Sequence, residues 1–174
     1  MHENLAIHGG KMFKNKSKKD GIANQINDWK KRCEQYRNFT KDDFANLDDQ
    51  FLIDACVAWT EKFKYSDRTY KNASLPCQNM IAVLTLDSQV KNGGFGSFYS
   101  NGYGDYGIDF VNAFRCVGLL NLANLISEID KLFRINRLTE NSMYEYDERY
   151  FELEEESDSF FVKYIRNNIN SFGD

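Results

Sequence analysis

The chain has 174 residues, of which 15% are aromatic and 28% are charged, with a formal net charge of −4 at pH 7. A chain of this length can bury one sizeable core, so folding requires neither a structural metal nor a disulfide framework. No apolar run approaches the roughly 20 residues of a membrane-spanning helix, and the N-terminal residues lack the apolar segment of a signal peptide. We therefore expect a cytoplasmic protein that does not enter a membrane.

Charge is distributed unevenly along the chain. Residues 1–41 contain ten Lys or Arg and four Asp or Glu, whereas the remainder contains twelve and twenty-two. Residues 1–21 are polar and lack apolar periodicity, which predicts a weakly structured basic arm. We expect the arm and a first helix in residues 1–40 and an all-helical domain in residues 41–174. The lysines of the arm could contact the phosphates of a nucleic acid, although a solvated tail is the simpler interpretation. These lysines are Lys11, Lys14, Lys16, Lys18 and Lys19.

The four cysteines are widely spaced and form no C-x-x-C pair. Cys56 and Cys116 lie in apolar helical patterns, where a free thiol behaves as a small hydrophobic side chain. Both histidines, His2 and His8, lie in the arm, so no cysteine has an evident catalytic base, and no metal-ligand spacing is present. We expect no metal, no cofactor and four reduced core cysteines, namely Cys33, Cys56, Cys77 and Cys116.

Apolar residues recur at helical spacing from residue 22 onward. The first amphipathic helix is predicted by the spacing of Ile22, Ile26, Trp29 and Cys33. Residues 40–43, Thr-Lys-Asp-Asp, are typical of a helix start. A broad apolar stripe then predicts a core-facing helix; it consists of Phe51, Leu52, Ala55, Cys56, Trp59 and Phe63.

The central helix is predicted to begin at Ser74, which can cap it, with Pro76 tolerated in its first turn. It extends to Lys91 and stops at Asn92-Gly93, because a helix C-terminus often needs a left-handed residue. Further helices are predicted over 110–118 and 122–133, followed by an acidic segment and a last helix over 160–169. One proline, few valines and no strand-like alternation favour an all-α fold. We expect a single-domain multi-helix bundle with a glycine and aromatic loop between its central helices.

That loop, residues 92–110, contains six of the eleven glycines. Within it, Gly102, Gly104 and Gly107 have the G-x-G-x-x-G spacing of dinucleotide-binding proteins. A dinucleotide site also needs a strand before the glycines and a second strand beyond the helix, and the sequence predicts neither. We therefore expect a structural role: Gly93-Gly94 reverse the chain tightly, and Asn101-Gly102 end a short helical turn. The aromatic side chains of this turn are predicted core anchors; they are Phe95, Phe98 and Tyr99.

The same residues carry a resemblance to a known family. The pattern V-x-N-G-G-F-x-x-F/Y-x-N-x-x-G resembles the hallmark of a bacterial family named after the C-terminal domain of a DNA-mimic protein, formerly a domain of unknown function. The resemblance covers roughly residues 47–172, and the basic arm falls outside it. The residues that supply the pattern are Val90, Asn92, Gly93, Gly94, Phe95, Phe98, Asn101 and Gly104.

The resemblance implies an all-helical domain without established enzymatic activity. It also suggests an acidic surface that imitates DNA and occupies a DNA-binding protein, with the mimic acting as a dimer. The residues of such a surface are not part of the hallmark. We therefore interpret the hallmark positions as structural and not as a binding site.

Residues 145–158 contain eight acids and one base, Arg149. Read as a helix, the segment directs Tyr146, Tyr150 and Leu153 inward and a row of carboxylates outward. It predicts a module that binds a basic protein, either a DNA-binding regulator or a toxin, and that does not itself bind DNA. An ordinary solvated helix face is the alternative. The predicted partner-binding residues are Glu145, Asp147, Glu148, Glu152, Glu154, Glu155, Glu156 and Asp158.

Two other functions remain open from the sequence. An enzyme could use Asp105 and Asp109 beside the glycine and aromatic loop for acid–base work. The domain has no histidine and no nucleophile with an evident base, which argues against catalysis. An immunity-type protein that neutralises a toxin would use the same acidic face as a DNA mimic.

Overall fold

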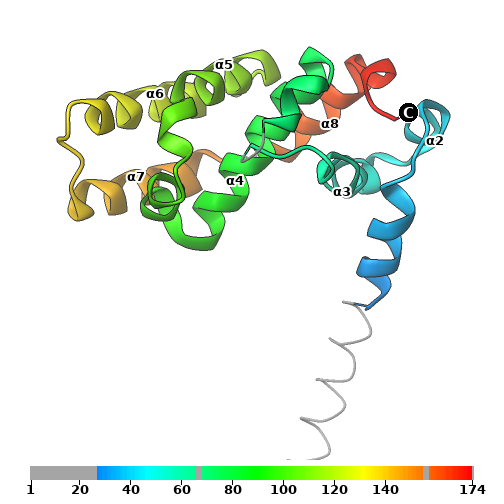
Figure 1. Ribbon diagram of the computed structural model, residues 1–174, viewed down its shortest axis with the longest axis horizontal. Coiled ribbons are helices and arrows are strands. Elements are labelled where there is room, and N and C mark those ends of the chain that lie inside the picture. The colour runs from blue at the N-terminus through cyan, green and yellow to red at the C-terminus, as the bar shows by residue number, and fades with distance from the viewer. Residues whose placement is uncertain (1–26, 66–67, 155–156, 174) are drawn as a thin grey trace, which may run out of the picture.

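The structure, a computed structural model, describes residues 27–65, 68–154 and 157–173. These residues form helices and connecting turns without any strand, which confirms the all-α fold (Figure 1). The elements are helical residues 27–36, α2 (Lys41–Asn46), α3 (Asp49–Thr60), α4 (Leu75–Ser100), α5 (Gly107–Val117), α6 (Leu120–Arg134), α7 (Glu140–Leu153) and α8 (Ser157–Asn167), with 3-10 helices η1 (Thr69–Asn72), η2 (Tyr103–Tyr106) and η3 (Ile169–Ser171).

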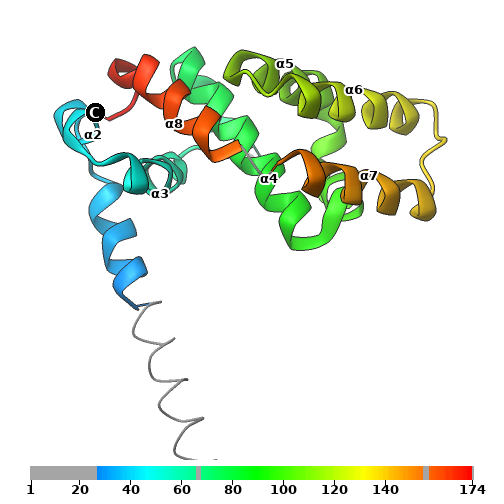
Figure 2. The ribbon, with the colours of Figure 1, turned by 180° about the vertical axis from the view of Figure 1, so that it is seen from behind.

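The long helix α4 runs through the middle of the molecule (Figure 1). It packs against α5 and α7 on one side and contacts α3 on the other, while α6 joins α5 to α7. At the opposite end, α8 packs on α3 and η3 returns to α2. Viewed from behind, α7 and α8 follow one another along the same side of the molecule (Figure 2). The candidate acidic segment therefore lies on the outer surface of the bundle.

Aromatic side chains fill much of the core. Near the C-terminus, Phe172 is fully buried and contacts Phe44 and Trp59, with ring centroids 6.0 and 6.4 Å away. Farther along the bundle, Phe98 and Phe110 are buried with their rings 5.1 Å apart. These contacts join residues distant in sequence into one continuous core.

Several predicted helix boundaries agree with the structure. Thr40 begins α2 with a capping box, in which Thr40 and Asp43 each accept a hydrogen bond from the other's backbone N–H. Gly118 ends α5 in the left-handed conformation, with φ of 99°. Ser74 does occupy the N-cap position of α4, but the expected side-chain cap is wrong. Its hydroxyl instead donates to the Ser171 carbonyl oxygen at 3.3 Å and so joins the two chain segments.

Two predicted core residues lie at the surface. Trp29 is 43% exposed, although Cys33 on the same helix is buried, while Ile22 and Ile26 lie outside the described residues. Cys116 is exposed, because it lies on the side of α5 away from the buried residues Phe110 and Phe114. The other three cysteines are buried free thiols, as predicted.

The glycine stretch contains the predicted reversal at Gly93-Gly94, the short helical segment after it and the left-handed break at Gly102, but more of the stretch is helical than the word loop implies. Helix α4 is interrupted at residues 93 and 94, which are not helical: Gly93 has φ −178° and ψ 24°, and Gly94 has φ 69° and ψ −177°. These two residues turn the chain sharply, and helical residues resume at Phe95 (Figure 1). Phe95 and Phe98 are 0% and 1% exposed, so the prediction that they anchor the core is confirmed.

Candidate protein-interaction face

Helix α7 begins at its own N-cap and is anchored on the bundle by a buried tyrosine. Thr139 and Ser142 form a capping box at its first turn. Tyr150 is 1% exposed, and its hydroxyl donates to Asp87 Oδ1 on α4 at 3.0 Å. Tyr146 is half-buried against the core. The predicted inward direction is correct for the two tyrosines but wrong for Leu153, which is 37% exposed because it is the last residue of the helix.

The outer surface of α7 carries three exposed carboxylates, Glu145, Glu148 and Glu152, which we call the acidic row. Their spacing of three and then four residues places neighbouring Cβ atoms about 5–6 Å apart on one helix face. The only base in the middle of this helix is directed elsewhere: Arg149 forms an ion pair with Glu128 on α6 at 3.1 Å and lies over the Tyr146 ring. The acidic row is therefore not neutralised by its nearest basic side chain.

The remaining predicted partner-binding residues have other positions. Asp147 accepts a hydrogen bond from the backbone N–H of Phe95 at 2.7 Å, and Glu154 forms an ion pair with Lys91 at 2.7 Å. Both carboxylates are partly buried and serve contacts within the protein. Asp158 is exposed in the first turn of α8.

The expected continuation of the acidic helix past residue 153 is wrong, since α7 ends at Leu153 and α8 begins at Ser157. The predicted contributions of Glu155 and Glu156 concern residues outside the described ranges.

Aromatic side chains accompany the acidic row. Tyr144 is 64% exposed and Phe151 is 44% exposed, one turn on either side of Glu148. A hydrogen bond to Glu148 raises the pKa of Tyr144 above its usual value. The face is therefore mixed, with carboxylates for a cation to approach and rings over which a guanidinium or ammonium group could lie.

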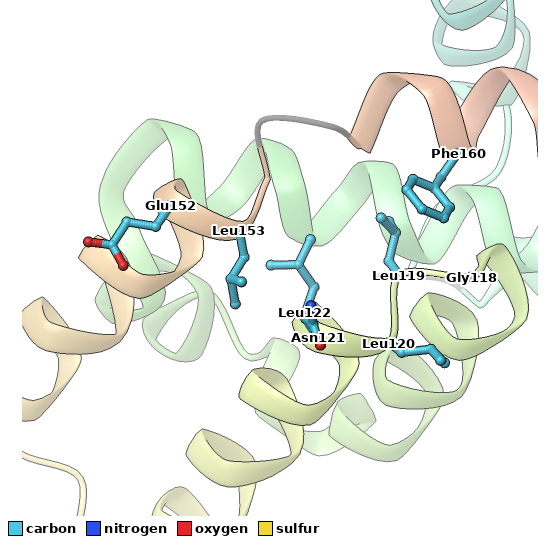
Figure 3. Close-up of a pocket in the computed structure, with 8 residues that line it drawn as sticks. All are labelled: Gly118, Leu119, Leu120, Asn121, Leu122, Glu152, Leu153 and Phe160. Carbon is cyan, nitrogen blue, oxygen red and sulfur yellow. The ribbon is translucent and has the colours of Figure 1, made fainter.

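A hollow of about 470 Å³ opens where α7 ends, at the junction with α6 and α8 (Figure 3). Glu152 of the acidic row lies at one end of this hollow and the Phe160 ring at the other, with leucines between them. The sequence did not predict the hollow, because its residues come from three separate stretches of chain. They are Gly118, Leu119, Leu120, Asn121, Leu122, Glu152, Leu153 and Phe160.

The two carboxylates proposed for catalysis, Asp105 and Asp109, do not line the same hollow. Asp109 lines a hollow of about 490 Å³ with Lys71, and it accepts a hydrogen bond from the Tyr70 hydroxyl at 3.5 Å. Asp105, in η2, does not line this hollow and acts electrostatically on Arg134 of α6. Burial and the nearby Asp109 raise the pKa of Tyr70 above its usual value. The hydroxyl therefore stays protonated at neutral pH and cannot act as a general base.

The glycine stretch creates two helix N-termini, and each faces a carboxylate of the protein itself. The Asp147 side chain binds the Phe95 N–H after the kink. At the start of α5, Asp130 lies so close to Gly107 that a Cβ there would be 1.9 Å from its Oδ1. A helix N-terminus favours negative charge, and here internal carboxylates supply it. A phosphate would have to displace them, which supports the structural interpretation of the G-x-G-x-x-G spacing.

Within the described ranges, no three His, Cys, Asp or Glu side chains come together as a metal-binding group. In the same part of the chain, no helix has both the length and the apolar character needed to cross a membrane. The described residues form an all-helical protein with exposed carboxylates along α7.

The comparison with protein families agrees with this class. The chain belongs to the DMP19-like protein family, a family of the DNA-mimic type, which it matches over residues 71–168. The match begins at the end of η1 and continues to the residue after α8, so it includes the kinked α4 and the acidic row. It is shorter at both ends than the span of residues 47–172 expected from the resemblance. No curated protein and no solved structure matches the chain.

Proposed function

We propose that this protein binds a basic protein partner through the acidic row and thereby competes with DNA for that partner. The observation that carries the proposal is the exposure of Glu145, Glu148 and Glu152 along one face of α7 while Arg149 is paired with Glu128. Membership in a family of the DNA-mimic type supports it, and that family is not known as one of enzymes. An immunity-type role would use the same face against a basic toxin.

The spacing of the row suits a surface that otherwise binds DNA. With a rise of 1.5 Å per residue, Glu145 and Glu148 are about 4.5 Å apart along the helix axis, and Glu148 and Glu152 about 6 Å. One DNA strand carries a phosphate about every 3.4 Å along its axis. The row therefore presents a line of charge of comparable density, though short. Its attraction acts over about a Debye length, so binding should weaken steeply with salt.

The test compares two variants with equal changes in charge. The row variant replaces Glu145, Glu148 and Glu152 by Lys. The control variant makes the same replacement at Asp28, Glu34 and Asp42, which are exposed on residues 27–36 and α2, far from α7 (Figure 1). Each full chain is immobilised and exposed to a native-host lysate at low salt, and the captured protein is purified and titrated directly. We expect the row variant to lose binding and the control variant to retain it.

Competition with DNA is measured on the same purified pair. Duplex DNA should release the partner from the wild-type chain, and salt at about 0.5 M should do the same. If the row variant retains every partner at low salt, or if DNA and the chain bind the partner together, the proposed function is wrong.

A further inference from the structure

The hollow beside the acidic row has apolar walls that face solvent. Leu120 is 59% exposed and Leu153 is 37% exposed, whereas Leu119 and Leu122 form a buried floor. The Phe160 ring closes one end (Figure 3). An isolated exposed leucine needs no explanation, but two around one hollow form a surface that an apolar side chain can cover.

The absence of a side chain at Gly118 helps to shape this end of the hollow. A Cβ on Gly118 would lie 3.2 Å from Cδ1 of Phe160, closer than ordinary van der Waals contact. Gly118 also has φ of 99°, which a side chain would disfavour. The ring of Phe160 therefore lies directly against the backbone at the turn between α5 and α6.

The end of the hollow formed by α7 is acidic. Glu152 lines it, and Glu148 lies one turn earlier on the same face of α7. An apolar hollow with carboxylates at one end fits a segment in which a bulky apolar side chain has lysines beside it. The apolar side chain would enter the hollow and the lysines would pair with these carboxylates.

The chain itself contains such a segment, Lys11-Met12-Phe13-Lys14. Phe13 is the only aromatic residue among residues 1–26, and two lysines bracket the Met12-Phe13 pair. We propose that the arm of the same chain binds this hollow, with Phe13 between Leu120 and Leu153 and with its lysines beside Glu152. Bound there, the arm covers one end of the acidic row and competes with any external basic partner.

The chain between Phe13 and the described helix is long enough for this contact. Position 27 is fourteen steps along the chain from position 13, which span up to about 46–50 Å when extended. The described part has 143 residues, for which a radius of gyration of about 15 Å is expected. The tether can therefore reach across the domain. A tether of this length gives an effective concentration on the order of millimolar, so weak intrinsic binding is enough.

The test uses the full chain with Phe13 replaced by the photoreactive analogue p-benzoylphenylalanine, which retains an aromatic ring. After irradiation of the dilute protein alone, we expect cross-links within one chain to residues 118–122 and 152–153, located by mass spectrometry. Glu152→Lys should lower the yield of these cross-links about fivefold, because an attractive charge pair becomes repulsive. Leu153→Asp should also lower the yield of these cross-links, because it removes an apolar side chain from the wall of the hollow.

The matched control is Glu145→Lys, which makes the same change in charge seven residues earlier on α7 and should leave most of the yield. Circular dichroism verifies that each variant remains helical, and all three changes are at exposed positions. Cross-links scattered over the surface, a yield unaffected by Glu152→Lys, or cross-links that join two chains would each overturn the proposal. The experiment needs no partner protein, so its result is independent of the proposed function.

Discussion

The Asp147 carboxylate accepts a hydrogen bond from the Phe95 backbone N–H at 2.7 Å, 52 residues away in sequence. Phe95 is the first helical residue after the kink in α4, so Asp147 serves as an N-cap supplied by another helix. The carboxylate occupies the space beside Gly94, where a Cβ would lie 2.2 Å from Oδ2. This one contact therefore links the bend of α4 to the position of α7.

Replacing Asp147 by Ala should lower the free energy of unfolding by about 1–2 kcal/mol, the usual range for the loss of an N-cap. Glu145→Ala removes an exposed carboxylate from the same helix, and we expect a change within about 0.5 kcal/mol. Urea titration of both variants measures the difference. Equal effects would mean that Asp147 belongs with the solvated acids and does not hold the kink.

Gly94→Ala should be more destabilising than Gly102→Ala, although both residues have positive φ, 69° and 82°. At Gly102 no atom lies within 4 Å of the added Cβ, so only backbone strain of about 1–2 kcal/mol is expected. At Gly94 the methyl group also displaces Asp147 and its hydrogen bond. We expect at least about twice the cost at Gly94 by urea titration. Adding Asp147→Ala to Gly94→Ala should then cost little more, since the cap is already lost.

The aromatic anchors permit a direct comparison of buried and exposed rings. Phe95→Ala and Phe98→Ala should each cost about 3–5 kcal/mol, because both rings are fully enclosed. Phe151→Ala, at a ring that is 44% exposed, should cost less than about 1 kcal/mol. Denaturant midpoints at unchanged slope measure these differences. A small effect at Phe95 or Phe98 would contradict the packing of the second part of α4.

The features that the sequence could predict are local ones. The Thr40 capping box depends on residues three apart, and the burial of Phe95 and Phe98 follows from their helical spacing. The left-handed end of α5 at Gly118 depends on a single residue. In each case the physical cause lies within one helical turn, so the amino-acid pattern is sufficient to show it.

The features that the sequence could not predict depend on distant partners. Eight acids close together indicated a binding face, but Asp147 and Glu154 turn toward Phe95 and Lys91 on α4. The prediction for Cys116 was wrong for a related reason. The segment around it is largely apolar, but the way α5 is rotated on the bundle directs Cys116 toward solvent. The hollow near Phe160 combines the turn after α5 with α6, α7 and α8, and no local pattern marks it.

The carboxyl group of Asp87 on α4, which contacts Tyr150 of α7, predicts that the stability of the protein depends on pH. Asp87 accepts a hydrogen bond from Tyr150 at 3.0 Å and forms an ion pair with Lys91 at 3.1 Å. Burial raises the pKa of this carboxyl above its usual value, although Lys91 and Tyr150 both act to lower it. The Asp87 carboxyl group thus binds its proton more tightly in the folded protein than in the unfolded chain. The stability that protonated Asp87 contributes is complete below the unfolded pKa of about 3.9 and is lost as the pH rises through the folded pKa.

Asp87→Asn removes this titration but retains an oxygen that accepts from Tyr150, while Lys91 retains Glu154 at 2.7 Å. We therefore expect the free energy of unfolding of the variant, relative to wild type, to rise between about pH 4 and about pH 7. Urea titrations at four pH values in this range measure the difference, and other titrating groups such as Asp147 largely cancel. If the difference falls with pH, the ion pair with Lys91 outweighs burial. Asp87 would then stabilise the contact between α4 and α7 in its charged form, contrary to this prediction.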